Sequence, residues 1–99
     1  MRTAFSKDER DLAEHHARYG KVFSSAQRVL ILWLLADSEK TVSEIARAIG
    51  ASLPRTSQHL QLMKLSNIIV SYRQQKNIYY RIADNELIQK LPVLFDRTK

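Results

Sequence analysis

The stretch TVSEIARAIGASLPRTSQHLQLMK combines two helix start signals with one stop signal, and it constrains the fold more than any other segment. Thr41 and Glu44 have the T-x-x-E spacing of a capping box, in which two side chains satisfy free backbone N–H groups. Gly50 is typical of the residue that ends a helix, because glycine adopts the left-handed conformation readily. Ser52 then caps another helix. The pattern predicts helices of about eight and twelve residues joined by the link GAS, which together form a helix-turn-helix.

Upstream of this unit the sequence predicts two further helices. The first covers residues 6–22, with a stripe made of Leu12, His15/His16, Tyr19 and Val22/Phe23. The second, AQRVLILWLLA, is apolar on nearly every side, so we expect it at the centre of the fold.

Downstream the hydrophobic period changes from that of a helix to that of a strand. The runs IIVSYR and NIYYRI, separated by QQK, predict a β-hairpin with a loop of about three to five residues and Asn77 in place of a glycine. Asp84 then caps a last predicted helix, whose apolar side carries Leu87, Ile88, Leu91 and Leu94. We therefore expect one mainly α domain over residues 1–99 with a small β-hairpin, in the element order of a winged helix-turn-helix.

Charge is distributed unevenly along the chain, whose formal net charge is +6. Up to Ile49 there are eight Lys and Arg against seven Asp and Glu, whereas from Gly50 to Ala83 there are five against none. A long carboxylate-free segment is either a solvated face or the binding surface for a polyanion, and we favour the polyanion.

Several classes of function are disfavoured. The chain has no cysteine, which removes disulfides and thiolate chemistry. It begins with a charged segment unlike a signal peptide, and its longest apolar run, VLILWLLA, is too short to span a bilayer. No P-loop, H-E-x-x-H or G-x-S-x-G motif is present. We expect a cytoplasmic protein that does not bind membranes and is not an enzyme.

The helix that begins after Ser52 has a polar first half, which a purely structural helix would not need. A buried stripe of Leu53, Thr56, Leu60 and Met63 would leave Arg55, Ser57, Gln58, Gln61 and Leu62 facing outward. The second helix of a helix-turn-helix places its N-terminal residues in the DNA major groove. There, arginine can bond guanine and glutamine can bond adenine, each through two hydrogen bonds.

The predicted DNA contacts extend from this helix into the hairpin. They are Ser52, Arg55, Ser57, Gln58, His59, Gln61, Lys64, Arg73, Lys76 and Arg81. Two alternatives stay open: His59 either contacts a phosphate or hydrogen-bonds within the domain, and the hairpin arginines and lysine contact phosphates or only solvent. The hairpin tyrosines could stack on bases, but strand alternation turns one of Tyr79 and Tyr80 inward, so packing is the better interpretation for at least half of them.

The segments VFSSAQRVLILWLLA, TVSEIARAIGASLPRTSQHLQLMKLSNIIV and RQQKNIYYRI, over about residues 20–83, resemble the ArsR/SmtB family of bacterial and archaeal repressors. The S-x-H-L of Ser57–Leu60 and the YYRI of the hairpin are the most specific pieces. The resemblance implies a homodimer that binds a palindromic operator and releases it when an effector binds. The first and last helices would form its interface, through Leu12, His16, Tyr19, Phe23, Leu87, Ile88 and Leu91.

The sequence departs from the family at its usual sensor sites. Metal-sensing members commonly carry a cysteine motif in the third helix or an Asp/His set on the last helix, and neither helix has Cys or His here. We therefore predict no metal site and no cofactor, and leave the effector unassigned. One alternative remains, a metal shared between subunits through His15 or His16.

The sequence thus favours a dimeric repressor that recognises specific double-stranded DNA. Two other hypotheses are a protein-interaction module with the same fold, whose basic face binds an acidic protein, and a non-specific architectural DNA-binding protein. Related winged-helix families such as the MarR group are a further possibility.

Overall fold

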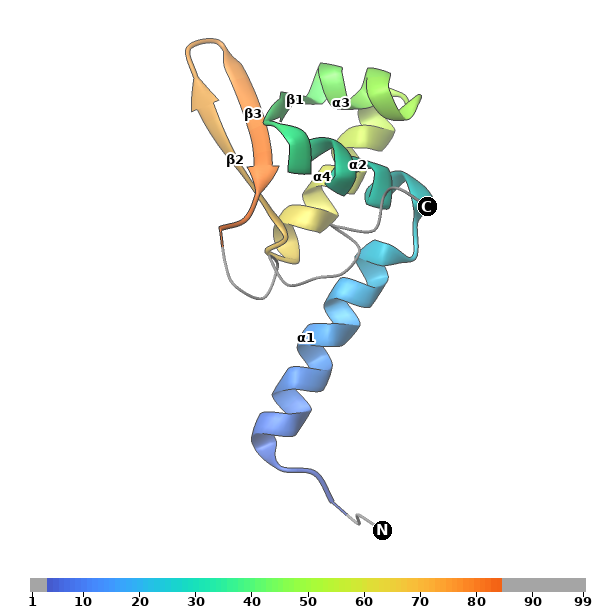
Figure 1. Ribbon diagram of the computed structural model, residues 1–99, viewed down its shortest axis with the longest axis vertical. Coiled ribbons are helices and arrows are strands. Elements are labelled where there is room, and N and C mark those ends of the chain that lie inside the picture. Colours follow the sequence, from blue (N-terminus) through green and yellow to red (C-terminus); the bar gives the residue numbers. More distant parts are fainter. Residues whose placement is uncertain (1–3, 85–99) are drawn as a thin grey trace.

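The computed structural model describes residues 4–84, without the side chains of residues 15, 16 and 18. Its elements are α1 (Lys7–Phe23), α2 (Ala26–Asp37), β1 (Lys40–Thr41), α3 (Val42–Ile49), α4 (Leu53–Leu65), β2 (Ile69–Gln74) and β3 (Asn77–Ile82). Figure 1 shows α2, α3, α4 and the sheet gathered in one body, from which α1 projects as a long arm. This arrangement is a winged helix-turn-helix, as the sequence predicted. The predicted last helix, with Leu87, Ile88 and Leu91, lies outside the described residues.

The helix ends lie where local hydrogen bonding places them. The predicted capping box of α3 is present, with 3.3 Å between Glu44 N and Thr41 Oγ1 and 2.8 Å between Thr41 N and Glu44 Oε1. Gly50 has a φ of +70°, in the left-handed region, and ends this helix. A second capping box, which was not predicted, joins Ser6 to Glu9 and starts α1. These local bonds fix where α3 ends and where α1 and α3 begin.

One hydrophobic cluster holds the body together and includes the inner end of α1. Its buried members are Tyr19, Val22, Ile31, Leu32, Leu35, Ile45, Leu60, Met63, Ile68, Ile69 and Ala83. Tyr19 is 5% exposed, so the prediction that it belongs to the dimer interface is corrected, because its ring is buried in the core of its own chain. Phe23, also predicted at the interface, packs partly buried against the same cluster. Leu12 is 50% exposed on the projecting part of α1.

The sheet has a third strand, β1, which was not predicted from the sequence. The strand order is β1-β3-β2, all antiparallel, with Lys40 opposite Tyr80 and Tyr72 opposite Tyr79. Tyr80 packs against the core, whereas the rings of Tyr72 and Tyr79 stack with centroids 5.8 Å apart. The expectation that one of Tyr79 and Tyr80 turns inward is therefore confirmed.

The turn of the β2–β3 hairpin differs from the prediction. Gln74 pairs with Asn77, so the connection is the dipeptide Gln75–Lys76 rather than a loop of three to five residues. The positive φ falls on Gln75, at 58°, and not on Asn77. Two-residue hairpin turns need a positive φ at their first central position, and polar residues other than glycine can adopt it at a modest cost. The short turn keeps the β2–β3 hairpin, called the wing below, narrow and places Lys76 at its tip.

Candidate nucleic-acid interface

The recognition helix candidate, α4, separates polar from buried residues along its length. Ser52 accepts a hydrogen bond from the backbone N of Arg55 at 3.2 Å and so caps the helix. Five of the predicted contact residues in α4 are exposed, namely Arg55, Ser57, Gln58, Gln61 and Lys64. Thr56, His59, Leu60 and Met63 are buried against the body. The helix therefore presents a polar surface to solvent over most of its length.

One residue of the predicted stripe, Leu53, and one residue expected to face outward, Leu62, differ from their expected placement. Leu53 is 51% exposed, because it occupies the first helical position, where the chain has only just left the α3–α4 turn. His59 takes the inward place instead, with 8% of its surface exposed. Leu62, expected outward, is half-buried. Burial thus removes His59 from the set of surface contacts.

A chain of polar side chains joins the start of α2 to α4. The Oε1 atom of Gln27 lies 2.9 Å from His59 Nε2 and 3.2 Å from Arg55 Nε. Arg28 Nη1 lies 3.1 Å from His59 Nδ1, and the same guanidinium donates to the backbone oxygens of Lys21 and Val22. Burial lowers the pKa of His59, and the positive charges of Arg28 and Arg55 lower it further. A neutral, buried His59 has no charge to offer a phosphate, so its alternative role within the domain is the one that the geometry supports.

Gln27 and Arg28 were not predicted as functional residues. They lie in a helix that was expected to serve only as apolar core, and α2 indeed carries the buried Ile31, Leu32 and Leu35. The available signal was the pair of polar residues at the start of an otherwise apolar helix. Nothing in the sequence indicated that this pair faces α4.

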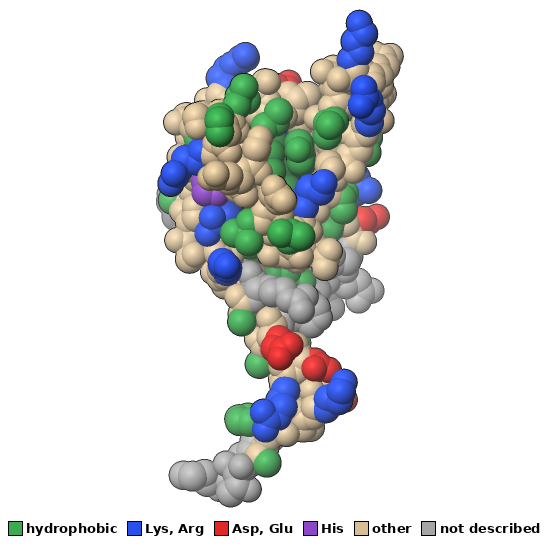
Figure 2. All heavy atoms as spheres, turned by 180° about the vertical axis from the view of Figure 1, so that it is seen from behind, with side chains coloured by type: hydrophobic (Ala, Val, Ile, Leu, Met, Phe, Trp, Pro, Cys, Tyr) green, Lys and Arg blue, Asp and Glu red, His purple; other side chains and the backbone are tan. Residues whose placement is uncertain are grey.

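The wing contributes two exposed cations at its end. Arg73 and Lys76 are exposed, and Arg73 Nε donates to the backbone oxygen of Gln75 at 3.2 Å, which holds its side chain along the turn. Figure 2 shows Lys and Arg side chains at the tip of the hairpin and over the body, while the acidic side chains of this face gather mainly on the α1 arm. Arg81 lies nearer the base of the wing, half-buried, and donates to the oxygen of Ile82.

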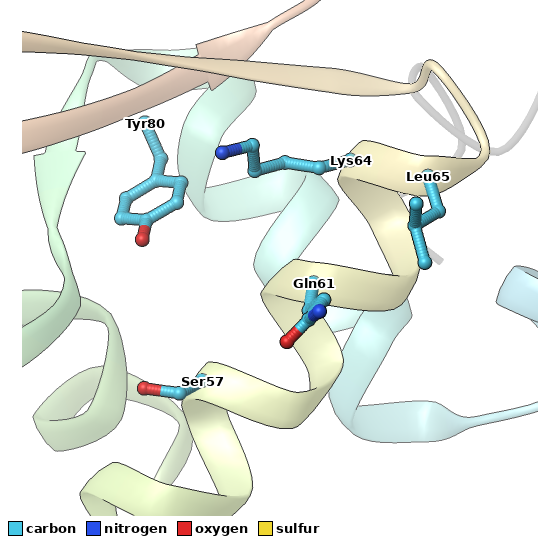
Figure 3. Close-up of a pocket in the computed structure, with 5 residues that line it drawn as sticks. All are labelled: Ser57, Gln61, Lys64, Leu65 and Tyr80. Carbon is cyan, nitrogen blue, oxygen red and sulfur yellow. The ribbon is translucent and has the colours of Figure 1, made fainter.

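A hollow lies between α4 and β3. It is lined by Ser57, Gln61, Lys64, Leu65 and Tyr80. Figure 3 shows the Lys64 side chain extending from α4 toward the β3 residue Tyr80, with the Ser57 hydroxyl pointing into the same space. The described lining residues thus offer one cation and several neutral hydrogen-bonding groups and include no carboxylate. Tyr80 was not among the predicted contacts.

Two properties of the described part of the chain bear on other functions. Among the described side chains, which do not include those of residues 15, 16 and 18, no group of three or more His, Cys, Asp or Glu is arranged to hold a metal ion. Across residues 4–84 no helix is both long and apolar enough to cross a membrane. Four of the residues predicted at a dimer interface are not covered: Leu87, Ile88 and Leu91 lie outside the described residues, as does the side chain of His16.

Comparisons with known proteins agree with this geometry. The family model described as "Bacterial regulatory protein, arsR family" matches residues 25–71. The HTH-type transcriptional regulator KmtR of Mycobacterium tuberculosis is 34% identical over 73 residues, which cover 74% of this chain and 55% of KmtR. The chain thus spans little more than half of that relative's length.

Two further proteins match over most of their length. The HTH-type transcriptional regulator YgaV of Escherichia coli is 38% identical over 80 residues, which cover 80% of each protein. The solved homodimeric winged helix-turn-helix DNA-binding domain of Mb0332 from Mycobacterium bovis, a possible ArsR-family transcriptional regulator, has a TM-score of 0.74 at 35% identity. That match covers 84% of this chain and 77% of the Mb0332 domain. This chain therefore belongs to the ArsR family of bacterial regulatory proteins.

Proposed function

We propose that the chain is a cytoplasmic, non-enzymatic transcriptional repressor that binds a specific double-stranded DNA sequence as a homodimer. The observation that carries this proposal is the surface of α4, where exposed Arg55, Ser57, Gln58 and Gln61 follow one another on a helix whose other side is buried. Their side chains supply the hydrogen-bonding groups that distinguish base pairs in the major groove. The family relationship supports the same function.

The remaining polar groups suit the sugar–phosphate backbone. Arg73 and Lys76 are exposed on the wing. If α4 lies in the major groove, the wing can contact phosphates or the minor groove beside it. Lys64 and Tyr80 lie across the hollow between α4 and β3, and they offer an ammonium and a hydroxyl group to one DNA phosphate. No carboxylate occurs between residues 50 and 83, which limits repulsion between DNA and the segment that contains α4 and the wing. We retain Ser52 and Arg81 only as peripheral contacts, because both are already engaged by the backbone.

Two substitutions separate base recognition from phosphate binding. Arg55→Ala should cost about 1–3 kcal/mol per half-site and relax base choice at one operator position, because it removes a bidentate pair of hydrogen bonds to guanine. Lys76→Ala should weaken all duplexes alike and reduce the salt dependence of log K by about 0.9 for each phosphate that is no longer neutralised. Both are measured by fluorescence anisotropy on a duplex selected in vitro and on its single-base variants.

The matched control is Arg10→Ala, which removes the same charge from an exposed position on the α1 arm. It should leave base preference unchanged. If Arg55→Ala leaves base preference intact, α4 does not read bases. Equal affinity for every duplex would instead favour the architectural protein, and no DNA binding would favour the protein-interaction module.

The dimer is the second part of the proposal. Leu12 is 50% exposed on the part of α1 that projects from the body, so within residues 4–84 the apolar side of this helix has little of the cover that an amphipathic helix normally has (Figure 1). We propose that α1 and the last predicted helix form an isologous interface around a two-fold axis, which would match a palindromic operator. The solved Mb0332 domain is described as homodimeric, which supports this assembly.

Sedimentation velocity tests the dimer directly. Leu12→Asp should shift the wild-type dimer toward monomer at micromolar concentration, because the introduced carboxylate would be buried at the interface. Ile78→Asp, at a wing residue that is 47% exposed, introduces the same charge far from α1 and should leave the assembly unchanged. A wild-type protein that sediments as a monomer would contradict this part of the proposal.

A further inference from the structure

Gln27 is the one residue of the polar chain that contacts both a buried and an exposed partner on α4. Its Oε1 atom lies 2.9 Å from Nε2 of the buried His59 and 3.2 Å from Nε of the exposed Arg55. An amide oxygen only accepts hydrogen bonds, so both neighbouring nitrogens donate to it. Gln27 itself is half-buried at the start of α2. It therefore links the buried His59 to Arg55, the first residue of α4 that is proposed to contact a base.

The position of the Gln27 side chain is set by a directed series of hydrogen bonds. The guanidinium of Arg28 can only donate, so His59 Nδ1 accepts from it and the imidazole proton must reside on Nε2. Arg28 is in turn held by the backbone oxygens of Val22 and Lys21 at 3.0 Å and 2.8 Å. The series runs from Arg28 to His59 to Gln27, and each bond orients the next acceptor. The lowered pKa of His59 agrees with the neutral ring that the series requires.

This arrangement limits how Arg55 can meet a base. With Nε engaged by Gln27, the two Nη groups remain at the outer end of the guanidinium and can form the end-on pair of hydrogen bonds to guanine O6 and N7. A long arginine side chain otherwise loses substantial rotamer freedom on binding, and ordering it beforehand reduces that loss. We infer that Gln27 is a positioning residue, which orients Arg55 toward one base and so contributes to base specificity without contacting DNA.

The inference rests on the proposed role of Arg55, and the experiment is arranged so that the two can fail separately. Gln27→Met keeps the length of the side chain and removes the acceptor, whereas Gln27→Glu keeps an acceptor oxygen in the same place. Each variant, Arg55→Ala and the Arg55→Ala/Gln27→Met double variant are titrated by fluorescence anisotropy at one salt concentration. The probes are the selected duplex, the duplexes with each other base at the position that Arg55 reads, and an unrelated duplex.

The expected result is a change in base preference rather than in general affinity. Gln27→Met should reduce the preference at the Arg55 position by about threefold to tenfold, the range expected when one rotamer-rich side chain is no longer ordered beforehand. Its affinity for the unrelated duplex should change by less than about twofold, because phosphate contacts are untouched. Gln27→Glu should retain the preference while binding all duplexes more weakly, because it adds a negative charge. The double variant should match Arg55→Ala.

Other outcomes overturn the inference in distinguishable ways. If Gln27→Met lowers affinity for every duplex equally and keeps the base preference, Gln27 serves only the stability of the domain. If the double variant loses more preference than Arg55→Ala alone, Gln27 acts on a different residue. Should Arg55→Ala leave the preference unchanged, the proposed function of α4 fails first and the inference falls with it. Gln27→Asn, which withdraws the acceptor by one methylene, repeats the test if the methionine variant does not fold.

Discussion

Thr56 carries a polar atom for which the described part of the chain provides no hydrogen-bond partner. Its side chain is fully buried on α4, and among the described residues its Oγ1 has no hydrogen-bond partner. Its backbone N, in contrast, donates to the Ser52 oxygen at 2.9 Å as a normal helical bond. A threonine at this position therefore contributes a methyl group to the core together with a desolvated hydroxyl. We predict that Thr56→Val stabilises the protein.

The magnitude follows from the cost of the unpaired hydroxyl. Burying a neutral hydrogen-bonding group without a partner costs about 1–3 kcal/mol. Valine has nearly the same shape and nearly the same helix propensity as threonine, so packing and propensity contribute little to the difference. We expect the lower end of the range, about 1 kcal/mol, because a small rotation would let a helical Thr hydroxyl approach the carbonyl of the preceding turn. For a domain of this size that gain corresponds to about 4–8 °C in Tm.

Urea unfolding followed by circular dichroism measures the gain. Wild type and variants are compared at one protomer concentration, because assembly would make apparent stability depend on concentration. Thr56→Ser is the matched control: it keeps the hydroxyl, loses the methyl and should be less stable than wild type. The side chain of Thr56 does not reach the surface, so operator affinity of the valine variant should stay within about twofold of wild type. A valine variant destabilised by more than about 0.5 kcal/mol would refute the reasoning, because a hydroxyl worth keeping must have a partner.

Two further predictions concern pH and the α3–α4 turn. Folded His59 has a lowered pKa, mainly through burial and then through Arg28 and Arg55, so below pH 6.5 the unfolded chain binds this proton more readily than the folded chain. The free energy of unfolding should therefore fall as the pH drops from about 7.5 to about 5.5, and His59→Gln should lack this part of the fall in parallel urea titrations. Gly50→Ala should cost about 1 kcal/mol by the same assay, because Gly50 has a φ of +70° while an added Cβ meets no atom within 4 Å. A cost near zero would mean that the turn relaxes, and a cost of several kcal/mol would mean that packing, not backbone strain, requires glycine.

Local chemistry determined much of this structure, and the sequence revealed it. The boundaries of α3 and the start of α4 follow from four residues, Thr41, Glu44, Gly50 and Ser52. The side chains of Thr41, Glu44 and Ser52 accept hydrogen bonds from backbone N–H groups within three residues, and Gly50 ends α3 in the left-handed conformation. The exposed side of α4 follows in the same way from helical periodicity, since the spacing of Thr56, Leu60 and Met63 already separates inside from outside. For these features a residue and its partner lie within one or two turns, so the local sequence is sufficient to predict them.

Contacts between distant segments determined the rest. The β1 strand exists because Lys40 and Thr41 lie opposite Tyr80 and Tyr79, which come almost forty residues later, and no local pattern marks such a short strand. Helical periodicity did not decide whether the His59 side chain is buried or exposed. It is buried because Gln27 and Arg28, on α2, supply the hydrogen bonds that offset the cost of burying an imidazole. The same helix supplies the oxygen that holds Arg55 Nε. Sequence periodicity thus indicated which residues of α4 could be exposed. Hydrogen bonds between α2 and α4 decided that His59 lies inside and how the Arg55 side chain is held. The sequence alone does not show these partners, because the hydrogen-bond partners of a polar side chain are set by whatever the tertiary fold brings within about 3 Å of it.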